Sequence, residues 1–216
     1  MIGAAREREA LAAFLLRLRS GGIADPRLFE ALEAVPRRAF LPPDVPDPYV
    51  DHAFPIDCGE TMPSALKAAR LVHLLDLKPH HRVLEIGTGS GYVAALMSRL
   101  AVRVVSLDRY KRLLVAAEAR LKDAKIANVH LLKEDGRNGY VAGGPYDRIV
   151  VHAALQAQPR PFLEQLNAQG MVLCAVGPGD GPQTLLRLQK IGSRFEREEV
   201  GTVRYQPIAF GTAAVL

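Results

Sequence analysis

The residues best suited to chemistry lie in a glycine-rich segment, residues 83–92, which reads Val-Leu-Glu-Ile-Gly-Thr-Gly-Ser-Gly-Tyr. An apolar run that breaks into alternate glycines is typical of a buried parallel strand that turns sharply into a helix. Gly87, Gly89 and Gly91 allow positive φ angles and a close approach to a ligand. Their spacing differs from the G-x-G-x-x-G pattern of dinucleotide sites, and no Gly-Lys-Ser/Thr follows to hold phosphates. The segment therefore predicts a nucleoside-type ligand.

Acidic residues at the ends of predicted strands narrow the choice of ligand. Glu85 would repel a pyrophosphate but would suit a cationic amino-acid group or a ribose hydroxyl. Asp108 follows at a distance of about 20 residues, where an acid can accept both hydroxyls of a ribose. Asp135 could accept a hydrogen bond from an adenine amino group, and Gly136 lets the chain turn over the ring edge. Each acid alone could simply cap a helix or a turn, but together they fit S-adenosylmethionine.

The glycine-rich segment also resembles motif I of the class I methyltransferases. The string VLEIGTGSGY is close to the form found in protein-L-isoaspartate O-methyltransferases. The resemblance implies S-adenosylmethionine as the cofactor, whereas the alternative is a strand-to-helix turn without a ligand. The cofactor-binding residues that it predicts are Glu85, Gly87, Thr88, Gly89, Ser90, Asp108, Arg109, Asp135 and Gly136.

Strand and helix patterns alternate along the second half of the chain. Such alternation indicates right-handed βαβ units, and hence a mostly parallel sheet with helices on both faces and ligands at the carboxyl ends of the strands. We expect a Rossmann-like α/β fold of the class I methyltransferase type. The expected strands are 82–86, 102–107, 129–132, 148–152 and 171–176, the expected helices are 92–100, 112–124 and 160–166, and the strands 184–190 and 203–210, separated by the charged stretch 194–199, should form an antiparallel edge.

The first part of the chain predicts a helical cap over this core. Apolar spacing and capping residues favour helices at 5–20, 27–34 and 63–75. Residues 37–63 are rich in proline and predict a long irregular loop, which in a compact domain is usually functional. We therefore divide one compact domain into residues 1–78, the cap and substrate loop, and residues 79–216, the cofactor-binding α/β core.

The resemblance to protein-L-isoaspartate O-methyltransferases covers roughly residues 31–210 and includes segments that few other methyltransferases share. They are VPRRAFLP at 35–42, YVD at 49–51, FPI at 54–56, HAA at 152–154, where the family usually has Thr-Ala-Ala, and VRYQPI at 203–208. The resemblance implies substrate contacts from Ile56, Gly59, His152, Val203 and Tyr205.

The reaction implied by this family is methyl transfer from S-adenosylmethionine to the α-carboxylate of L-isoaspartyl residues in damaged proteins or peptides. A carboxylate with a pKa near ~3.5 is ionised at neutral pH, so no general base is needed. The site has to aim one carboxylate oxygen at the methyl group and exclude water. Hydroxyls and backbone N–H groups are sufficient donors for that purpose.

The chain departs from the family in the segment that should supply these donors. Residues 56–63 read Ile-Asp-Cys-Gly-Glu-Thr-Met-Pro, where the usual bacterial form is Ile-Gly-x-Gly-Gln-Thr-Ile-Ser. Pro63 replaces the serine and has neither a hydroxyl nor an N–H, while Asp57 and Glu60 add charges that repel a carboxylate. We expect Ser64 to take the serine's role and Thr61 to be the retained hydroxyl, the alternative being that both only cap the next helix.

These departures leave two other functions open. One is a methyltransferase with a changed acceptor, such as another carboxylate, a small molecule or RNA. The other is a non-catalytic binding module that retains the cofactor pocket. His152 adds to the ambiguity, because an imidazole at a strand end could orient a carboxylate, act as a base toward another acceptor, or merely line a wall.

The composition limits the possible binding partners and the cellular location of the protein. The net charge of +5 favours acidic partners, but the arginines are scattered along helices, so nucleic acid is not the expected partner. Two distant cysteines without metal-ligand spacing predict no metal site. The absence of long apolar runs and the charged residues 6–9 favour a cytoplasmic protein without a membrane anchor. We expect a monomer whose partners are isoaspartate-containing peptides or proteins.

Overall fold

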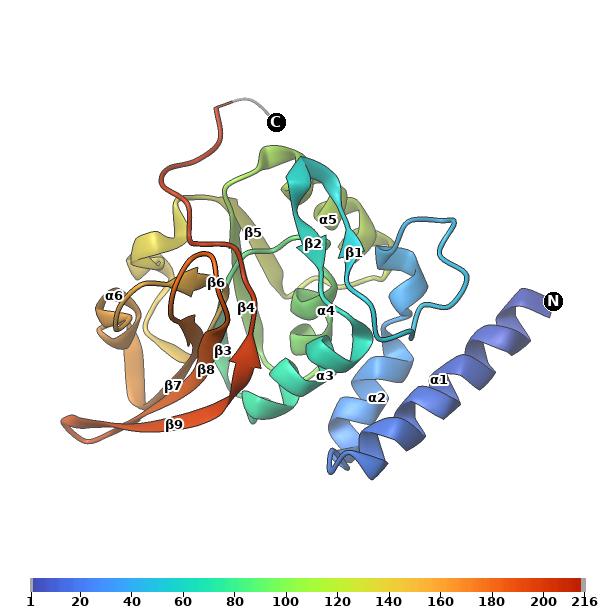
Figure 1. The fold of residues 1–216 in the computed structure, drawn as a ribbon, viewed down its shortest axis with the longest axis horizontal. Coiled ribbons are helices and arrows are strands. Elements are labelled where there is room, and N and C mark those ends of the chain that lie inside the picture. Colours follow the sequence, from blue (N-terminus) through green and yellow to red (C-terminus); the bar gives the residue numbers. More distant parts are fainter. Residues whose placement is uncertain (1, 215–216) are drawn as a thin grey trace.

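The computed structural model describes residues 2–214, with side chains from residue 5 onward. Residue 1 of the predicted cap (1–78) and residues 215 and 216 of the predicted core (79–216) lie outside the described residues. A seven-stranded sheet in the order β5-β4-β3-β6-β7-β8-β9 forms the centre of the molecule (Figure 1). Its strands are β3 (Arg82–Ile86), β4 (Arg103–Asp108), β5 (Val129–Lys133), β6 (Tyr146–Leu155), β7 (Leu166–Val176), β8 (Gln183–Ile191) and β9 (Arg194–Val203).

The pairing of the strands confirms the predicted sheet. The first five strands pair in parallel, whereas β8 runs antiparallel to both of its neighbours. Helices α4 (Tyr92–Ser98), α5 (Lys111–Asp123) and α6 (Arg160–Leu163) fill the predicted gaps. Between β5 and β6 the chain forms only the short helices η3 (Gly136–Asn138) and η4 (Val141–Gly143). The mostly parallel α/β fold with an antiparallel edge is thus the expected one.

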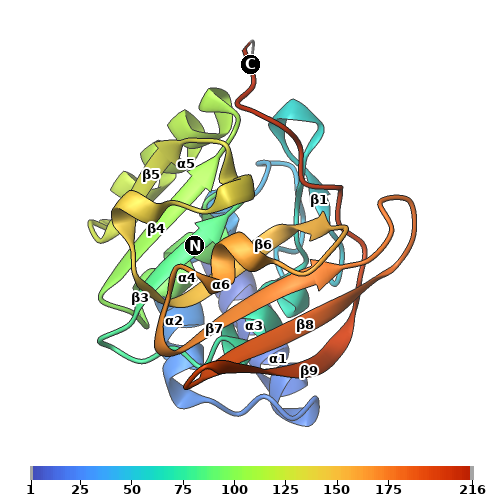
Figure 2. The ribbon, with the colours of Figure 1, turned by 90° about the vertical axis from the view of Figure 1, so that its left-hand side faces the viewer.

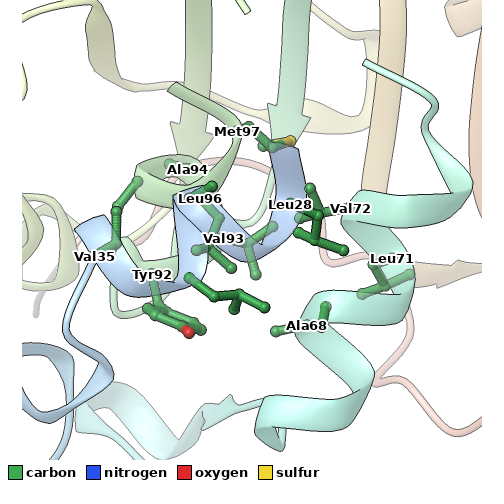
Figure 3. Packing of buried hydrophobic residues seen from close by; sticks show 14 of the residues in the cluster. Leu28, Val35, Ala68, Leu71, Val72, Tyr92, Val93, Ala94, Leu96 and Met97 are labelled. Atoms are coloured by element: carbon green, nitrogen blue, oxygen red, sulfur yellow. The ribbon is translucent and has the colours of Figure 1, made fainter. Parts of the chain in front are cut away.

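Alternate residues of the central strands bury their side chains in two different cores. Val83 belongs to the core that includes helices α2, α3 and α4, while its neighbour Leu84 belongs to the core that includes α6. This is the pattern expected for parallel strands that are covered on both faces. Figure 3 shows the first core around α4, whose residues Val93 and Leu96 pack beside Leu28 and Val72.

Three helices of the first part of the chain pack on one side of the sheet (Figure 1). They are α1 (Ile2–Ser20), α2 (Pro26–Ala34) and α3 (Ala65–Leu74). Asp25 caps α2 through the N–H of Arg27, as the Asp-Pro pair predicts. Because the same apolar cluster runs from Phe14 to the sheet residue Leu185, the cap and the core form one compact body, and their division at residue 78 stays a prediction.

The stretch predicted as a long loop contains short elements instead of irregular chain throughout. It begins with η1 (Arg37–Phe40) and ends in a small hairpin of β1 (Phe54–Pro55) and β2 (Thr61–Met62), with η2 (Asp57–Gly59) at its tip. Cys58 and Gly59 in the tip both have positive φ angles, of 63° and 73°. We call residues 54–62 the hairpin.

The prediction for the last strand is wrong. The charged stretch that was expected to link two strands is itself the strand β9, which pairs with β8 through a tight turn near Gly192. β9 lies at the edge of the sheet, where charged side chains remain in water, so alternating hydrophobicity is weak there. Residues 204–213 instead form an extended segment that runs back past the end of β6, where Ala154 pairs with Pro207. We call residues 204–213 the C-terminal segment, which lies beside the hairpin in Figures 1 and 2.

Candidate active site

The glycine-rich loop has the conformation that its sequence predicts. Gly87, Gly89 and Gly91 have φ angles of 96°, 53° and 85°, which strongly favour glycine. The N–H groups of Gly87 and Thr88 donate to the carbonyl of Leu107 at 2.8 and 3.1 Å, which ties the loop to the end of β4. The loop therefore holds its backbone close to the carboxyl ends of two adjacent strands.

Two adjoining pockets lie at this end of the sheet. The first extends from the glycine loop to the ends of β4 and β5 and is closed by the C-terminal segment. The second lies between the glycine loop, the hairpin and the start of the C-terminal segment. The predicted residues in the first are Thr61, Gly87, Gly89, Asp108, Arg109, Asp135, Gly136 and His152, and those in the second are Thr61, Glu85, Gly87, Thr88, Gly89, Ser90, His152 and Tyr205.

A few residues line both pockets and mark the place where they join. We call this set the junction; it consists of Glu60, Thr61, Gly87, Gly89, His152 and Gln206. Molecules bound in the two pockets would meet at the junction. A group transferred from one molecule to the other has to pass there, so the side chains of the junction are candidates for a role in the reaction.

Asp108 lies at the end of β4, as the strand pattern predicts, and its carboxylate is largely buried. One oxygen accepts from the N–H of Gly89 and the other from the N–H of Tyr110, both at 3.0 Å. Burial raises the pKa of Asp108, while these backbone hydrogen bonds oppose the rise. Each oxygen retains a lone pair, so the fixed carboxylate can still accept hydroxyl groups from a ligand in the first pocket.

Asp135 also lines the first pocket, but the structure gives it partners that were not predicted. Arg137 donates to both of its oxygens at 2.8–3.1 Å, and the N–H of Gly211 donates to one of them at 2.9 Å. The hydrogen bonds from Arg137 lower the pKa of Asp135 to about 2. The Arg137 guanidinium in turn lies 4.0 Å from the ring centre of Phe210. Asp135 thus fastens the C-terminal segment over the pocket.

Glu85 is fully buried behind the glycine loop. The Ser106 hydroxyl donates to one of its oxygens at 2.6 Å, and His152 Nε2 lies 3.0 Å from the other. Direct binding of the cofactor by this carboxylate therefore stays a prediction, whereas its hold on Ser106 and His152 is observed.

The two hydroxyls predicted to be catalytic lie in different surroundings. Thr61 is exposed and belongs to the junction. Ser64 is buried, and its hydroxyl accepts from the N–H of Lys67 at 3.2 Å at the start of α3. Ser64 is not among the described residues that line either pocket. The structure therefore favours the capping alternative for Ser64 and leaves Thr61 available for a ligand.

Three of the predicted substrate residues lie near the pockets without lining them. Ile56 lies under the glycine loop, the carbonyl of Gly59 accepts from the Gln206 side chain at 3.3 Å, and Val203 packs against the core. Sequence reasoning missed Lys67 and several C-terminal residues that the fold brings to the pockets. These are Arg204, Gln206, Pro207, Ile208, Ala209 and Gly211.

The added acid of the hairpin tip has a partner on α5. Asp57 forms an exposed, two-pronged ion pair with Arg112, at 2.9 and 3.3 Å. Together with the hydrogen bond from Gln206 to Gly59, this pair ties the tip to elements on both sides of the first pocket. Asp57 is not among the described residues that line either pocket, whereas Glu60 lines both and is the added carboxylate that an acceptor would meet.

The residues of the first pocket fit S-adenosylmethionine. Asp108 offers acceptors for ribose hydroxyls, and the glycine loop is free of side chains beside them. Arg109 also lines this pocket, and its buried Nε has no hydrogen-bond partner among the described residues. Fold and site together define a class I S-adenosylmethionine-dependent methyltransferase.

The comparisons with known proteins identify the family. The family model described as "Protein-L-isoaspartate(D-aspartate) O-methyltransferase (PCMT)" matches residues 9–213. A protein-L-isoaspartate O-methyltransferase of Rhizobium meliloti (strain 1021) is 40% identical over 93% of this chain and 99% of its own length. A protein-L-isoaspartate O-methyltransferase 2 of Rhodopseudomonas palustris (strain HaA2) is 43% identical over 94% of each chain. The chain belongs to the protein-L-isoaspartate(D-aspartate) O-methyltransferase family, which confirms the predicted methyltransferase and its cofactor.

Solved structures agree with this assignment. A protein-L-isoaspartate O-methyltransferase superimposes with a TM-score of 0.81 at 25% identity, over 94% of this chain and 67% of that one. A second protein, a putative family member from Plasmodium falciparum in complex with S-adenosyl-L-homocysteine, gives a TM-score of 0.77 at 21% identity, over 91% of this chain and 97% of that one, and supports the fold.

The described residues contain neither a candidate membrane span nor a candidate metal site. No helix within them is long and apolar enough to span a membrane. They also contain no group of three or more His, Cys, Asp or Glu side chains that could hold a metal ion.

Proposed function

We propose that this chain methylates the α-carboxylate of L-isoaspartyl residues in peptides and proteins, and that transfer takes place at the junction of the two pockets. The observation that carries the proposal is the contrast between the pockets. Carboxylates outnumber cations in the lining of the first, where Glu60, Glu134, Asp108 and Asp135 face only Arg109, and this suits a cationic nucleoside. In the second, Lys67 and Arg204 balance Glu60 and Glu85, so this pocket is the one that can accept an anionic group.

In the first pocket we assign the ribose to Asp108 and the adenine to the side of Asp135 and Gly136. When bound there, S-adenosylmethionine supplies an electrophilic methyl group. The chain itself supplies position and shelter. The hairpin and the C-terminal segment cover the pocket and are linked to each other through Gln206 and Gly59, so they limit the access of water to the acceptor.

In the second pocket the acceptor carboxylate requires orientation but no base, because it is already ionised. The Thr61 hydroxyl at the junction is one donor for it. Lys67 and Arg204 are exposed, and no ion pair engages either of them among the described residues, so they attract the peptide by long-range charge. The cytoplasmic location and the monomeric state stay predictions.

A direct assay tests this function. The chain is incubated with methyl-labelled S-adenosylmethionine and an isoaspartyl peptide, and base-labile methyl ester is counted. The control is the same peptide with a normal aspartyl residue, which has its carboxylate at a different distance from the backbone. Ester formation on the isoaspartyl peptide alone supports the proposal. Equal labelling of both peptides, or of neither, contradicts it and favours a changed acceptor or a binding module.

Substitution of the two hydroxyls should separate a capping role from a contact with the acceptor. Thr61→Val should lower kcat/KM for the peptide about tenfold, because one hydrogen bond to a charged group is lost. Ser64→Ala should leave kcat/KM unchanged and lower the free energy of unfolding by about 1 kcal/mol, since it removes the cap of α3. Peptide kinetics and urea unfolding of both variants check this. A larger kinetic loss in Ser64→Ala than in Thr61→Val would reverse the assignment.

The junction carboxylate Glu60 should weaken acceptor binding at neutral pH. Burial, and next the charge of Asp108, raise the pKa of Glu60, with Arg109 opposing. Glu60→Gln removes a negative charge from the acceptor's path and should lower the KM for the peptide about fivefold, given ~1 kcal/mol for such a repulsion at a solvated site. As the pH falls, wild-type Glu60 becomes neutral earlier than an ordinary glutamate, so the two KM values should converge. KM measured across a pH series checks this; a constant ratio would contradict it.

A further inference from the structure

A buried chain of hydrogen bonds leads from the glycine loop to the junction. The Thr88 hydroxyl lies 2.6 Å from the Ser106 hydroxyl, which donates to Glu85 Oε2 at 2.6 Å. His152 Nε2 lies 3.0 Å from Glu85 Oε1. Glu85 and Ser106 are fully buried, whereas the His152 side chain is 14% exposed. His152 is therefore the most exposed link of this chain and the one that lies at the junction.

The contacts of Glu85 fix the position of the His152 ring. Ser106 donates to one oxygen of Glu85, and the other oxygen shares a hydrogen bond with His152 Nε2 in which either group can carry the proton. Among the described residues the ion pair of Glu85 is with His152 and with no lysine or arginine. Nε2 is therefore engaged by Glu85, and Nδ1 is the ring nitrogen left for another partner.

The other ring nitrogen of His152 is available to a ligand. Nδ1 has no hydrogen-bond partner among the described residues, and the ring lines both pockets. Pro63, which lines the second pocket, has no N–H or hydroxyl to offer. His152 can therefore supply at the junction an N–H donor that Pro63 cannot.

We infer that the His152 ring binds the acceptor carboxylate through its Nδ1–H, and that Glu85 is the residue that positions it. This inference rests on the proposed function, since it names the residue that recognises the carboxylate of the same acceptor. A hydrogen bond from the ring fixes one oxygen and leaves the other for the methyl group. Glu85 and His152 are 67 positions apart in the sequence and meet where strands β3 and β6 pair.

The charged groups that line the second pocket together with His152 come from four elements. Glu85 on β3 and Glu60 on the hairpin are acidic, whereas Lys67 on α3 and Arg204 on the C-terminal segment are basic. Tyr205, whose ring centre lies 6.5 Å from that of His152, stays neutral because burial raises its pKa to about 12. The nearest of these, Glu85, is also the most buried and so the least screened.

The test compares His152→Ala with His152→Gln, a neutral donor of similar reach. In His152→Ala the KM for the isoaspartyl peptide should rise about ten- to hundredfold, with a smaller change in kcat. Calorimetric titration of the peptide into enzyme saturated with S-adenosylhomocysteine should show the same loss, while the Kd of S-adenosylhomocysteine itself should change much less, since Asp108 and the glycine loop of the first pocket are untouched. His152→Gln should recover part of the affinity.

A double-mutant comparison distinguishes positioning from a general structural role. Glu85→Gln should raise the KM for the peptide in the wild-type background and add little to the rise in His152→Ala, because Glu85 acts through the His152 ring. The ring signals of His152, assigned by NMR through their absence in His152→Gln, should shift when the peptide is added.

Two results would overturn the inference: wild-type peptide affinity in His152→Ala, or a rise in KM from Glu85→Gln that is as large in His152→Ala as in the wild-type background. If wild-type enzyme makes no ester on the isoaspartyl peptide, the proposed function fails instead. The ring signals then decide the present inference, because a peptide-induced shift of the His152 resonances upholds a carboxylate contact and an unchanged spectrum overturns it.

Discussion

Asp108→Ala is expected to weaken the binding of S-adenosylhomocysteine about a hundredfold or more. The buried carboxylate is held in place by the N–H groups of Gly89 and Tyr110, so its free lone pairs face the first pocket without any cost of reorganisation. Each hydrogen bond from a ribose hydroxyl to a charged group contributes about 1.5–3 kcal/mol, and two such bonds are lost. Isothermal titration with S-adenosylhomocysteine measures the effect directly, independently of any acceptor.

A second variant separates binding from folding in this experiment. Alanine also leaves two backbone N–H groups without their acceptor, which should cost about 1–2 kcal/mol of stability. Asp108→Asn keeps one acceptor oxygen and should lie between alanine and wild type in both affinity and stability. Asp123→Ala, an exposed acid at the end of α5, is the matched control and should bind as wild type does. If the folded fraction of Asp108→Ala binds S-adenosylhomocysteine with wild-type affinity, Asp108 does not contact the cofactor.

The sheet and the glycine loop could be predicted because their signals are local. A short apolar run followed by glycines at alternate positions determines both the strand β3 and the turn after it, and the structure places Gly87 and Gly89 as expected. The final strand could not be predicted in the same way. Residues 194–203 pair only with β8 at an edge of the sheet, so solvent on the exposed side removes the alternation on which strand prediction depends.

The parts of the site that lie at strand ends could be predicted. Runs of apolar residues in the sequence show where β4 and β5 end, and Asp108 and Asp135 follow these runs. Their partners were not predictable, because Gly211 and the C-terminal segment reach Asp135 from far along the chain without a local signal. For Glu85 the sequence indicated the position and missed the role, since the pairing with His152 joins strands β3 and β6 and exists only in the folded sheet.

Another contact without a local signal is made by a buried arginine that supports the hairpin. Arg37 is fully buried, and it donates from Nε to the carbonyl of Pro48 at 2.8 Å and from Nη2 to that of Pro63 at 2.5 Å. Its guanidinium lies 4.8 Å from the ring centre of Tyr92, and no carboxylate forms an ion pair with it in the described part of the chain. Burial lowers the pKa of Arg37, and the facing Tyr92 opposes this shift. Arg37 therefore joins the chain before and after the hairpin to the start of α4.

Arg37→Met should accordingly lower the free energy of unfolding by about 3 kcal/mol and the Tm by roughly 10 °C. Methionine fills much of the volume and relieves the cost of a buried charge, but it leaves two carbonyls and the Tyr92 ring without their cation. The freed Pro63 carbonyl should also raise the KM for the peptide, because Pro63 lines the second pocket. Urea unfolding and peptide kinetics check both effects. Arg6→Met, at an exposed site on α1, is the control and should change stability by less than about 0.5 kcal/mol. A loss in Arg37→Met no greater than in the control would show that the relieved charge outweighs the two hydrogen bonds, and that packing alone holds the hairpin in place.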